Sequence, residues 1–163
     1  MAVSKSIRKG RIMEKAVSVD AILDFAIERE EESYEFYTNL AQVVERAEMQ
    51  KVFGRFAREE LGHKEKLMGI KAGKIMMPAA RMIADLKIAD YVVDVEISTD
   101  LDYQHALIIA MKKEKAAFRL YTNLANIVDD PSLSAVFQVL AQEEAKHKLR
   151  FEIEYDDNIL SEN

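Results

Sequence analysis

Apolar residues recur every three or four positions in two stretches of the first half of the chain, with charged residues between them. The apolar positions are Ile22, Phe25, Ala26, Tyr34, Tyr37 and Leu40 in the first stretch and Val52, Phe53, Phe56, Leu61 and Leu67 in the second. This spacing places the apolar side chains on one face of a helix. We therefore predict two amphipathic helices, at about 18–46 and 49–71, separated by a break near residues 46–48.

The second half of the chain repeats the first half at an offset of 84 positions. The segment YTNLA, for example, occurs at 37–41 and again at 121–125. The alignment needs no gap across this window, so we interpret the chain as two copies of one helical hairpin. The repeat predicts a third helix at about 102–128 and a fourth at about 132–156.

Turn and cap signals support these boundaries. Asp130 is a residue type that caps helix N-termini, and Pro131 suits the first helical position because it has no N–H to leave unpaired. The residues STD at 98–100 are a candidate cap for the third helix. With only 5 Gly and 2 Pro, the chain has too few turn residues for a fold of many short strands.

The connection between the two hairpins is long, and it could hold a short helix of its own. Two helical hairpins joined by one long crossover are the arrangement of ferritin-like bundles. We therefore predict an all-α, ferritin-like four-helix bundle made of two repeated helical hairpins with a long crossover connection. Its parts are an N-terminal tail at 1–17 and a bundle at 18–157, divided into a hairpin at 18–71, a crossover at 72–101 and a hairpin at 102–157.

Composition excludes several classes of site and partner. The chain has no cysteine, which excludes disulfides, iron–sulfur clusters and thiol catalysis and fits a reducing compartment. No apolar run approaches the roughly 20 residues that span a bilayer. The net charge of −6 argues against a nucleic-acid binder, which needs a basic face. We expect a cytoplasmic protein that binds neither membrane nor nucleic acid.

Each copy of the repeat carries the same set of chemical groups. Glu60 and His63 are three residues apart and share one helix face, and Glu30 lies on the apolar stripe of the preceding helix. The corresponding residues of the second copy are Glu114, Glu144 and His147. Two tyrosines, Tyr37 and Tyr121, each follow the first acid of their copy by about two helical turns and lie on its face.

These side chains add up to four carboxylates and two imidazoles around a pseudo-two-fold axis. Four buried carboxylates cannot all stay ionised without cations, because desolvation and mutual repulsion oppose it. Two divalent ions would balance the charge. Oxygen-rich ligation with one nitrogen per metal suits iron or manganese, and zinc fits without changing its redox state. We predict two iron ions per site, with manganese or zinc as substitutes.

Two further acids repeat beside this set. Glu59 and Glu143 precede the second acid of each copy, but their side chains point about 100° away around the helix. We expect them on the solvated helix face, with a place beside the site or its access path as the alternative. His105 corresponds to Ala21, so we do not expect it to be a ligand.

The segments EREEESYEFYTNLA and FAREELGHKEKL resemble the rubrerythrin-type branch of the ferritin-like diiron-carboxylate proteins. The resemblance covers nearly the whole chain except the N-terminal tail and the connector. It implies that Glu60 and Glu144 bridge the two metal ions. It also implies that the terminal ligands are Glu30 with His63 and Glu114 with His147, and that Tyr37 and Tyr121 are hydrogen-bond partners of the ligands.

Two features depart from the family pattern. Rubrerythrins proper carry a rubredoxin domain with a four-cysteine iron site, whereas this sequence has no cysteine. The electron donor is therefore expected to be a separate, rubredoxin-like protein. Rubrerythrins also tend to have an additional Glu ligand one turn after the acid of the third helix, where this chain has Ala117. The expected ligand set is then symmetric.

Two functions fit these residues. The first is a redox enzyme of oxidative-stress defence that reduces hydrogen peroxide or dioxygen, since two irons can supply the two electrons that O–O cleavage needs. The alternative is ferritin-like iron oxidation, storage and sequestration, which requires a closed shell of many subunits. The resemblance favours a homodimer or small homo-oligomer, and the connector is long enough to exchange a hairpin between two chains.

Overall fold

The computed structural model describes residues 17–73, 82–83 and 102–160. Four helices of 25 residues each form the described part of the bundle: α2 (Val19–Val43), α3 (Ala47–Lys71), α4 (Tyr103–Ile127) and α5 (Pro131–Tyr155). A short π-helix, η2 (Asp156–Leu160), extends α5. Each of the four helices begins and ends within three residues of its predicted boundary, so the sequence prediction of the helices is confirmed.

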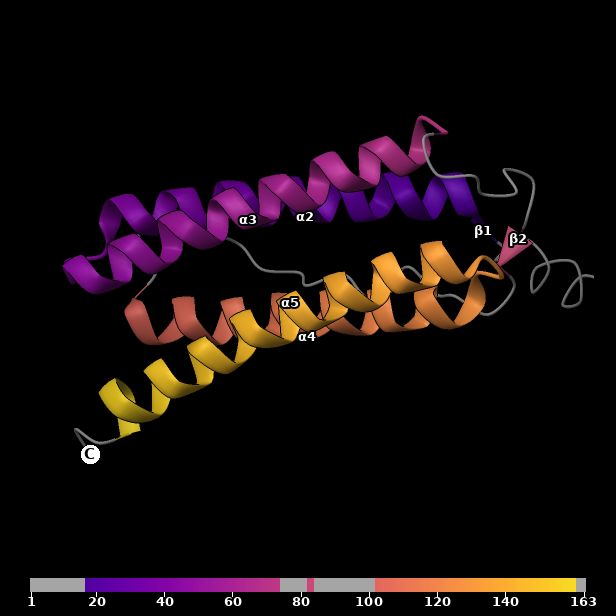
Figure 1. The fold of residues 1–163 in the computed structure, drawn as a ribbon. Helices are drawn as coiled ribbons and strands as arrows, with labels where there is room; N and C mark the ends of the chain where they lie inside the picture. Colours follow the sequence, from indigo (N-terminus) through magenta and orange to yellow (C-terminus); the bar gives the residue numbers. More distant parts are fainter. Residues whose placement is uncertain (1–16, 74–81, 84–101, 161–163) are drawn as a thin grey trace, which may run out of the picture.

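The four helices form two hairpins that lie side by side. α2 packs against α3 and α4 packs against α5, and the four axes run roughly along one direction (Figure 1). The end of α3 and the start of α4 lie at opposite ends of the bundle. A helix of 25 residues is about 38 Å long, so the connection between the hairpins must cover about that distance. The ferritin-like arrangement with a long crossover is confirmed.

The described part of the crossover is a short strand. β2 (Met82–Ile83) pairs antiparallel with β1 (Val17–Ser18), with Val17 opposite Ile83. The sequence pattern does not predict this ladder, because two residues are too short to show an alternation. The tail at 1–16 and the short helix suggested for the crossover lie outside the described residues.

The helix starts use different caps. The carboxylate of Asp130 accepts hydrogen bonds from two backbone N–H groups in the first turn of α5, and Pro131 is the first residue of that helix, as predicted. Asp102 caps α4 by accepting a bond of 2.8 Å from the backbone N–H of His105, which lowers the pKa of Asp102. The predicted cap STD at 98–100 is wrong, because α4 begins after Asp102.

The apolar core consists of two clusters at opposite ends of the bundle. The Tyr121 cluster contains Ile22, Leu23, Phe25, Ala26, Leu67, Ile70, Leu120, Tyr121, Leu124, Ala125, Leu133, Phe137, Leu140 and Ala141. The Tyr37 cluster contains Phe36, Tyr37, Leu40, Met49, Val52, Phe53, Phe56, Ala57, Ala106, Leu107, Ile109, Ala110 and Phe151. The offset of 84 positions converts most of one cluster into the other, so the repeat in the sequence is a pseudo-two-fold axis of the fold.

The position of the axis determines where polar groups can be buried. The axis passes through the middle of the bundle, between the two clusters. Burial of the clusters holds the four helices together at both ends. None of the helices in the described part of the chain has the combination of length and apolar character that crossing a membrane requires.

Candidate metal centre

The middle of the bundle is filled by charged side chains. α2 and α4 each contribute one acid, and α3 and α5 each contribute one acid and one histidine. The structure therefore brings together all six side chains that the sequence singled out, and each is at most 4% exposed: Glu30, Glu60, His63, Glu114, Glu144 and His147. Among the described residues, the other buried charged side chain is Glu154, near the end of α5.

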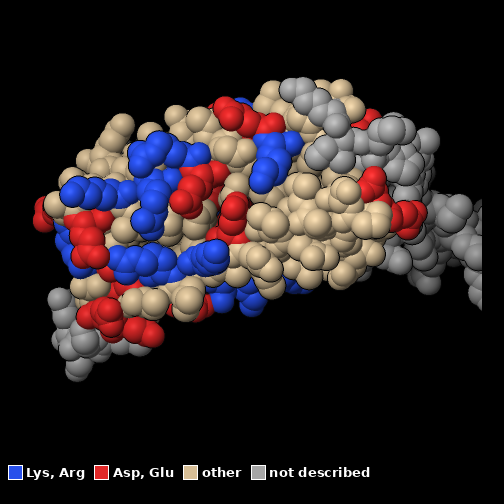
Figure 2. Space-filling view, in the orientation of Figure 1, with Lys and Arg blue, Asp and Glu red and all other residues tan. Residues whose placement is uncertain are grey.

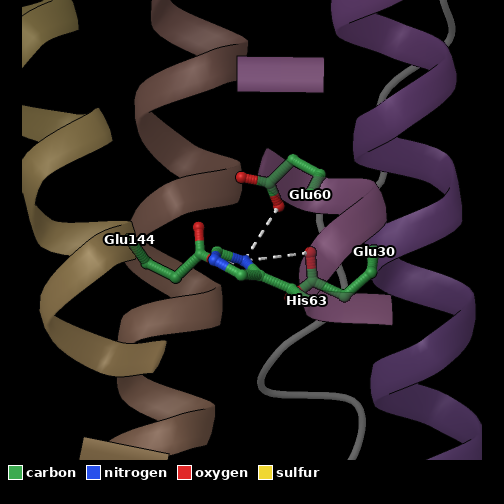
Figure 3. A group of neighbouring side chains, drawn as sticks. All are labelled: Glu30, Glu60, His63 and Glu144. Atoms are coloured by element: carbon green, nitrogen blue, oxygen red, sulfur yellow. Dashed lines mark ion pairs between the residues drawn. The ribbon is translucent and has the colours of Figure 1, made fainter. Parts of the chain in front are cut away.

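The six residues form two overlapping groups that could each hold a cation. The first group comprises Glu30, Glu60, His63 and Glu144, and the second comprises Glu60, Glu114, Glu144 and His147. Within each group one ligand atom per residue lies within 4.8 Å of the others. Figure 3 shows the first group, with the three carboxylates directed at the ring of His63. Glu60 and Glu144 belong to both groups, so the two candidate cation positions share two carboxylates.

In the first group, Nδ1 of His63 faces three carboxylates. It lies 2.8 Å from Oε1 of Glu144, 3.7 Å from Oε2 of Glu30 and 3.8 Å from Oε2 of Glu60. Two of these contacts are the dashed lines in Figure 3. The i, i+3 spacing on α3 accounts for the contact with Glu60, whereas the other two contacts cross to α2 and α5.

The second group repeats this geometry. Nδ1 of His147 lies 2.8 Å from Oε1 of Glu60, 3.6 Å from Oε1 of Glu114 and 3.7 Å from Oε2 of Glu144. The rings of His63 and His147 are nearly parallel, with their centroids 6.2 Å apart. The pseudo-two-fold symmetry therefore extends from the helices to individual side-chain atoms.

Most polar atoms that face the centre lack a hydrogen-bond partner within the protein. They are Oε2 of Glu30, Oε1 of Glu60, Nδ1 of His63, Oε2 of Glu114, both carboxylate oxygens of Glu144 and Nδ1 of His147. Leaving one buried acceptor without a donor costs about 1–3 kcal/mol. Lone pairs that converge at these distances are the donor set of a metal site. The residues therefore fit bound metal.

The pKa values of the carboxylates reflect the same crowding. Burial raises the pKa of Glu60 and Glu144 well above the ordinary 4.5, and the negative charges of Glu30 and Glu114 raise it further. Burial also opposes ionisation of Glu30, but its interactions with the neighbouring Glu60, His63 and Tyr121 side chains outweigh that effect and lower its pKa. Without metal, the two acids that both groups share tend to hold protons, and a divalent cation would displace them.

The two tyrosines connect the two copies of the repeat. Tyr37 donates a hydrogen bond to Oε1 of Glu114, and Tyr121 donates one to Oε1 of Glu30. Burial raises the pKa of both tyrosines, and nearby carboxylates raise it further, so each phenol keeps its proton and acts as a donor. The sequence placed each tyrosine on the face of the acid in its own helix, whereas the hydrogen bond goes to the acid of the other copy.

Glu59 and Glu143 lie on the solvated helix face, where their side chains are 45% and 41% exposed, and each also contacts a histidine of the centre. Oε2 of Glu143 lies 2.5 Å from Nε2 of His63, and Oε2 of Glu59 lies 2.5 Å from Nε2 of His147. Each bond runs between α3 and α5. With Nε2–H as the donor, Nδ1 carries the lone pair that faces the centre. The sequence signal for a place beside the site was that Glu59 and Glu143 recur at the same offset, each directly before an acid of the centre.

The acids also change the pKa of the histidines. Burial alone would lower the pKa of His63, but Glu30 and Glu143 outweigh it and raise the pKa above 6.5. The same holds for His147 with the corresponding acids.

His105, in contrast, is exposed at the start of α4, where Nδ1 lies 2.8 Å from Asp102, and it has no place in the centre.

A wide cleft of about 640 Å³ lies between α3 and α5, on the outer side of the two histidines. The rings of His63 and His147 and the carboxylates of Glu59 and Glu143 line it. Its other charged lining residues are Arg55, Lys66, Lys146 and Arg150. Figure 2 shows basic side chains, with acidic ones between them, gathered over the half of this face that is nearer the C-terminus.

Comparison with known proteins agrees with the fold. The family model for rubrerythrin matches residues 3–71 and 21–155. A search of curated proteins gives no match. A solved structure from Thermotoga maritima, described as a ferritin-like diiron-carboxylate protein, is similar over 88% of this chain and 97% of its own, with a TM-score of 0.76 and 24% identity.

A second solved structure, a hypothetical protein from Pyrococcus furiosus, is similar over 86% of this chain and 89% of its own, with a TM-score of 0.68 and 23% identity. At these identities the two structures establish the ferritin-like fold alone. The family match covers most of the chain, including all four helices and the six side chains of the centre. The chain therefore belongs to the rubrerythrin family.

Proposed function

We propose that this protein is a diiron oxidoreductase that reduces hydrogen peroxide with electrons from a separate donor protein. The observation that carries the proposal is the set of partnerless acceptor atoms, which come from six buried side chains and form two overlapping groups. A structural bundle gains nothing from such a cluster, because every unpaired buried acceptor destabilises the fold.

Each ligand has a proposed place. Glu60 and Glu144 would be shared by the two ions, because they are the residues that both groups contain. Glu30 and His63 would complete the ligands of one ion. Glu114 and His147 would complete those of the other. One nitrogen per ion and an excess of carboxylate oxygen favour iron or manganese.

The surrounding side chains hold these ligands in place. The phenols of Tyr37 and Tyr121 bind one oxygen of Glu114 and Glu30, which directs the other oxygen of each acid to the centre. Glu143 holds the Nε2–H of His63 and thereby keeps Nδ1 free for a metal ion. The two apolar clusters exclude bulk water from both ends of the centre.

A pair of ferrous ions, when bound, supplies one electron each, and O–O cleavage of a peroxide needs two. The net reaction consumes one hydrogen peroxide, two protons and two electrons and releases two water molecules. The protons come from solvent. The electrons are returned by a separate one-electron donor, for which we propose a rubredoxin-like protein.

The test is anaerobic loading with iron(II), followed by elemental analysis and stopped-flow absorbance on mixing with peroxide or with air-saturated buffer. We expect about two irons per chain and faster oxidation by peroxide than by dioxygen. Light scattering should then give a dimer or small oligomer. A chain that keeps its helical fold but binds no iron would refute the metal centre.

The alternative of iron storage makes a different prediction in the same experiment. A storage protein would oxidise iron(II) faster with dioxygen, would take up far more than two irons per chain, and would assemble into a closed shell. Those three results together would replace the peroxidase proposal.

A further inference from the structure

A second, much smaller space lies beside Glu30, on the side of the bundle opposite the wide cleft. It lies between α2 and α4 and has a volume of about 30 Å³. A cavity needs about 10–15 Å³ to hold one water molecule, so this one accommodates a molecule of about two heavy atoms. Its lining residues are Arg29, Glu30, Glu32, Ser33, Lys113, Ala116, Ala117, Leu120 and Tyr121.

One wall of this cavity is formed by Glu30, a residue of the candidate metal centre. Glu30 lines the cavity, is 2% exposed, and keeps its Oε2 atom without a hydrogen-bond partner. Tyr121, which binds the other oxygen of Glu30, forms the adjacent wall. A small molecule in the cavity would therefore contact a proposed metal ligand directly.

The lining of the cavity includes two basic side chains. Arg29 and Lys113 correspond to each other in the repeat, and both line the cavity. The guanidinium of Arg29 binds Glu32 at 2.8 Å, while its Nε–H is buried and has no acceptor. Burial lowers the pKa of Lys113. Arg29 and Lys113 therefore offer hydrogen-bond donors to a small polar molecule, while Glu30 and Glu32 line the same cavity and balance their charge.

The wide cleft between α3 and α5 is closed at its inner end. There the rings of His63 and His147, hydrogen-bonded to Glu143 and Glu59, stand between the cleft and the carboxylates. A molecule entering by the cleft would have to displace a proposed metal ligand. The cavity between α2 and α4 is lined by a proposed ligand, Glu30, itself, and two alanines, Ala116 and Ala117, leave room beside it.

We propose that this cavity is the access path and docking site for a peroxide-sized oxidant, with Ala117 as the residue that keeps it open and Arg29 and Lys113 as hydrogen-bond donors to the bound molecule. The inference rests on the proposed function, because it names the route by which the substrate of that centre enters. The repeat is broken at this place: Leu120 lines the cavity beside Glu30, whereas the larger Phe36 has the corresponding position near Glu114.

The first test is independent of metal. The chain has no cysteine, so Ala117→Cys and Gly62→Cys each introduce a single thiol, one in the cavity and one in the wide cleft. An added Cβ at Gly62 meets nothing within 4 Å, which makes that position a matched control. Hydrogen peroxide converts a thiol to a sulfenic acid and releases water, and mass spectrometry follows this change and labelling by a fluorescein maleimide.

We expect peroxide to oxidise the thiols of both metal-free variants at similar rates. The maleimide should react at least about 10-fold more slowly with Ala117→Cys than with Gly62→Cys, because only a small molecule fits the cavity. A thiol at position 117 that reacts with neither reagent would show that the cavity is closed to peroxide. A thiol that reacts equally well with both would show an open surface. Either result would overturn the proposal.

The second test uses the iron-loaded protein. Ala117→Leu, and the milder Ala117→Val, should slow oxidation by peroxide at least about 10-fold with an unchanged iron content, while Gly62→Leu should leave the rate unchanged. The proposal fails if Gly62→Leu is the slow variant or if neither Ala117 variant is slower. Failure of the wild-type chain to bind iron would refute the proposed function, and the thiol experiment would still decide whether the cavity admits peroxide.

Discussion

The middle of the bundle and its two ends follow the internal repeat to different degrees. In the middle, the two short histidine–carboxylate distances are both 2.8 Å, and the two histidine Nε2 contacts are both 2.5 Å. At the ends, the repeat places Ile70 of the Tyr121 cluster in the position that corresponds to Glu154 beside the Tyr37 cluster. An apolar residue at one end is thus a buried carboxylate at the other.

The environment of Glu154 explains how this end tolerates the charge. Arg46 and the phenol of Tyr103 both donate to Oε1 of Glu154, and Arg150 lies 3.9 Å from Oε2. Burial and Glu154 raise the pKa of Tyr103, which keeps its proton. At an end of the bundle, the side chains need only pack without voids and pair their polar groups. A residue there can therefore differ between the two copies if its neighbours differ as well. The centre needs matching atoms from both copies, and a change in one copy would leave the other without its partner.

The largest expected effect comes from breaking the symmetry of the centre. Glu60→Gln removes a carboxylate that both groups share, so we expect close to zero metal ions per chain, whereas Glu30→Gln should leave about one of two. Elemental analysis after loading and gel filtration measures both. Equal metal loss in the two variants would contradict the shared role of Glu60.

The second prediction concerns two variants in which each end of the bundle receives the residue of the other end. Ile70→Glu buries a carboxylate in the Tyr121 cluster without a cation, and we expect it to lower the free energy of unfolding by about 3–5 kcal/mol. Glu154→Ile should change it by no more than about 1 kcal/mol, because Arg46, whose side chain is 43% exposed, can turn to water.

Urea denaturation of both metal-free variants and the wild type gives these values. A large loss of stability in Glu154→Ile would mean that the ion pair at this end contributes more than the apolar packing of the opposite end. A small loss in Ile70→Glu would mean that the Tyr121 cluster opens to water.

The third prediction tests whether the contacts of the two histidines with Glu143 and Glu59 are equivalent. Glu143→Ala and Glu59→Ala should each weaken metal binding about 10- to 100-fold, and by similar factors, because each frees one histidine ring from its carboxylate partner. Competition with a chelator of known affinity measures the loss. The control is Glu65→Ala, at an exposed position of α3, which should bind metal like the wild type. Unequal losses would show that the two histidines differ.

The smallest effect concerns pH in the metal-free protein. The folded-state pKa values of Glu60, Glu144 and both histidines are raised, so the stability that these groups contribute is present below their unfolded values of 4.5 and 6.5 and is lost as the pH rises through the folded values. The midpoint temperature of thermal unfolding should therefore decrease as the pH is raised from about 5 to about 8. The free energy of unfolding should change by no more than about 1.4 kcal/mol per pH unit for each proton.

The metal-loaded protein should behave in the opposite way. Metal ions compete with protons for the same carboxylates, so the stabilisation by metal should grow as the pH rises over the same range. Calorimetry of both forms in one buffer series measures the comparison. A metal-free protein that becomes more stable toward pH 8 would contradict the raised pKa values.

Much of the fold could be predicted from local patterns. The spacing of apolar residues gave each helix to within three residues, and the offset between the two YTNLA segments gave the pseudo-two-fold axis. The cap of α4 was misplaced, because STD and Asp102 offer similar side chains and only the hydrogen bond to His105 decides between them. The β1–β2 ladder was missed, because its two-residue strands are far apart in the sequence.

The sequence by itself determined four helices, their pairing into two hairpins and the six side chains of the centre. It could do so because helical periodicity is local and because two Glu-x-x-His motifs at one offset are a rare pattern. Only the tertiary structure decided that Tyr37 binds Glu114, that Glu143 binds His63, and that a small cavity beside Ala117 reaches Glu30. Those contacts cross between hairpins, where the packing of side chains over a few ångströms determines which groups meet.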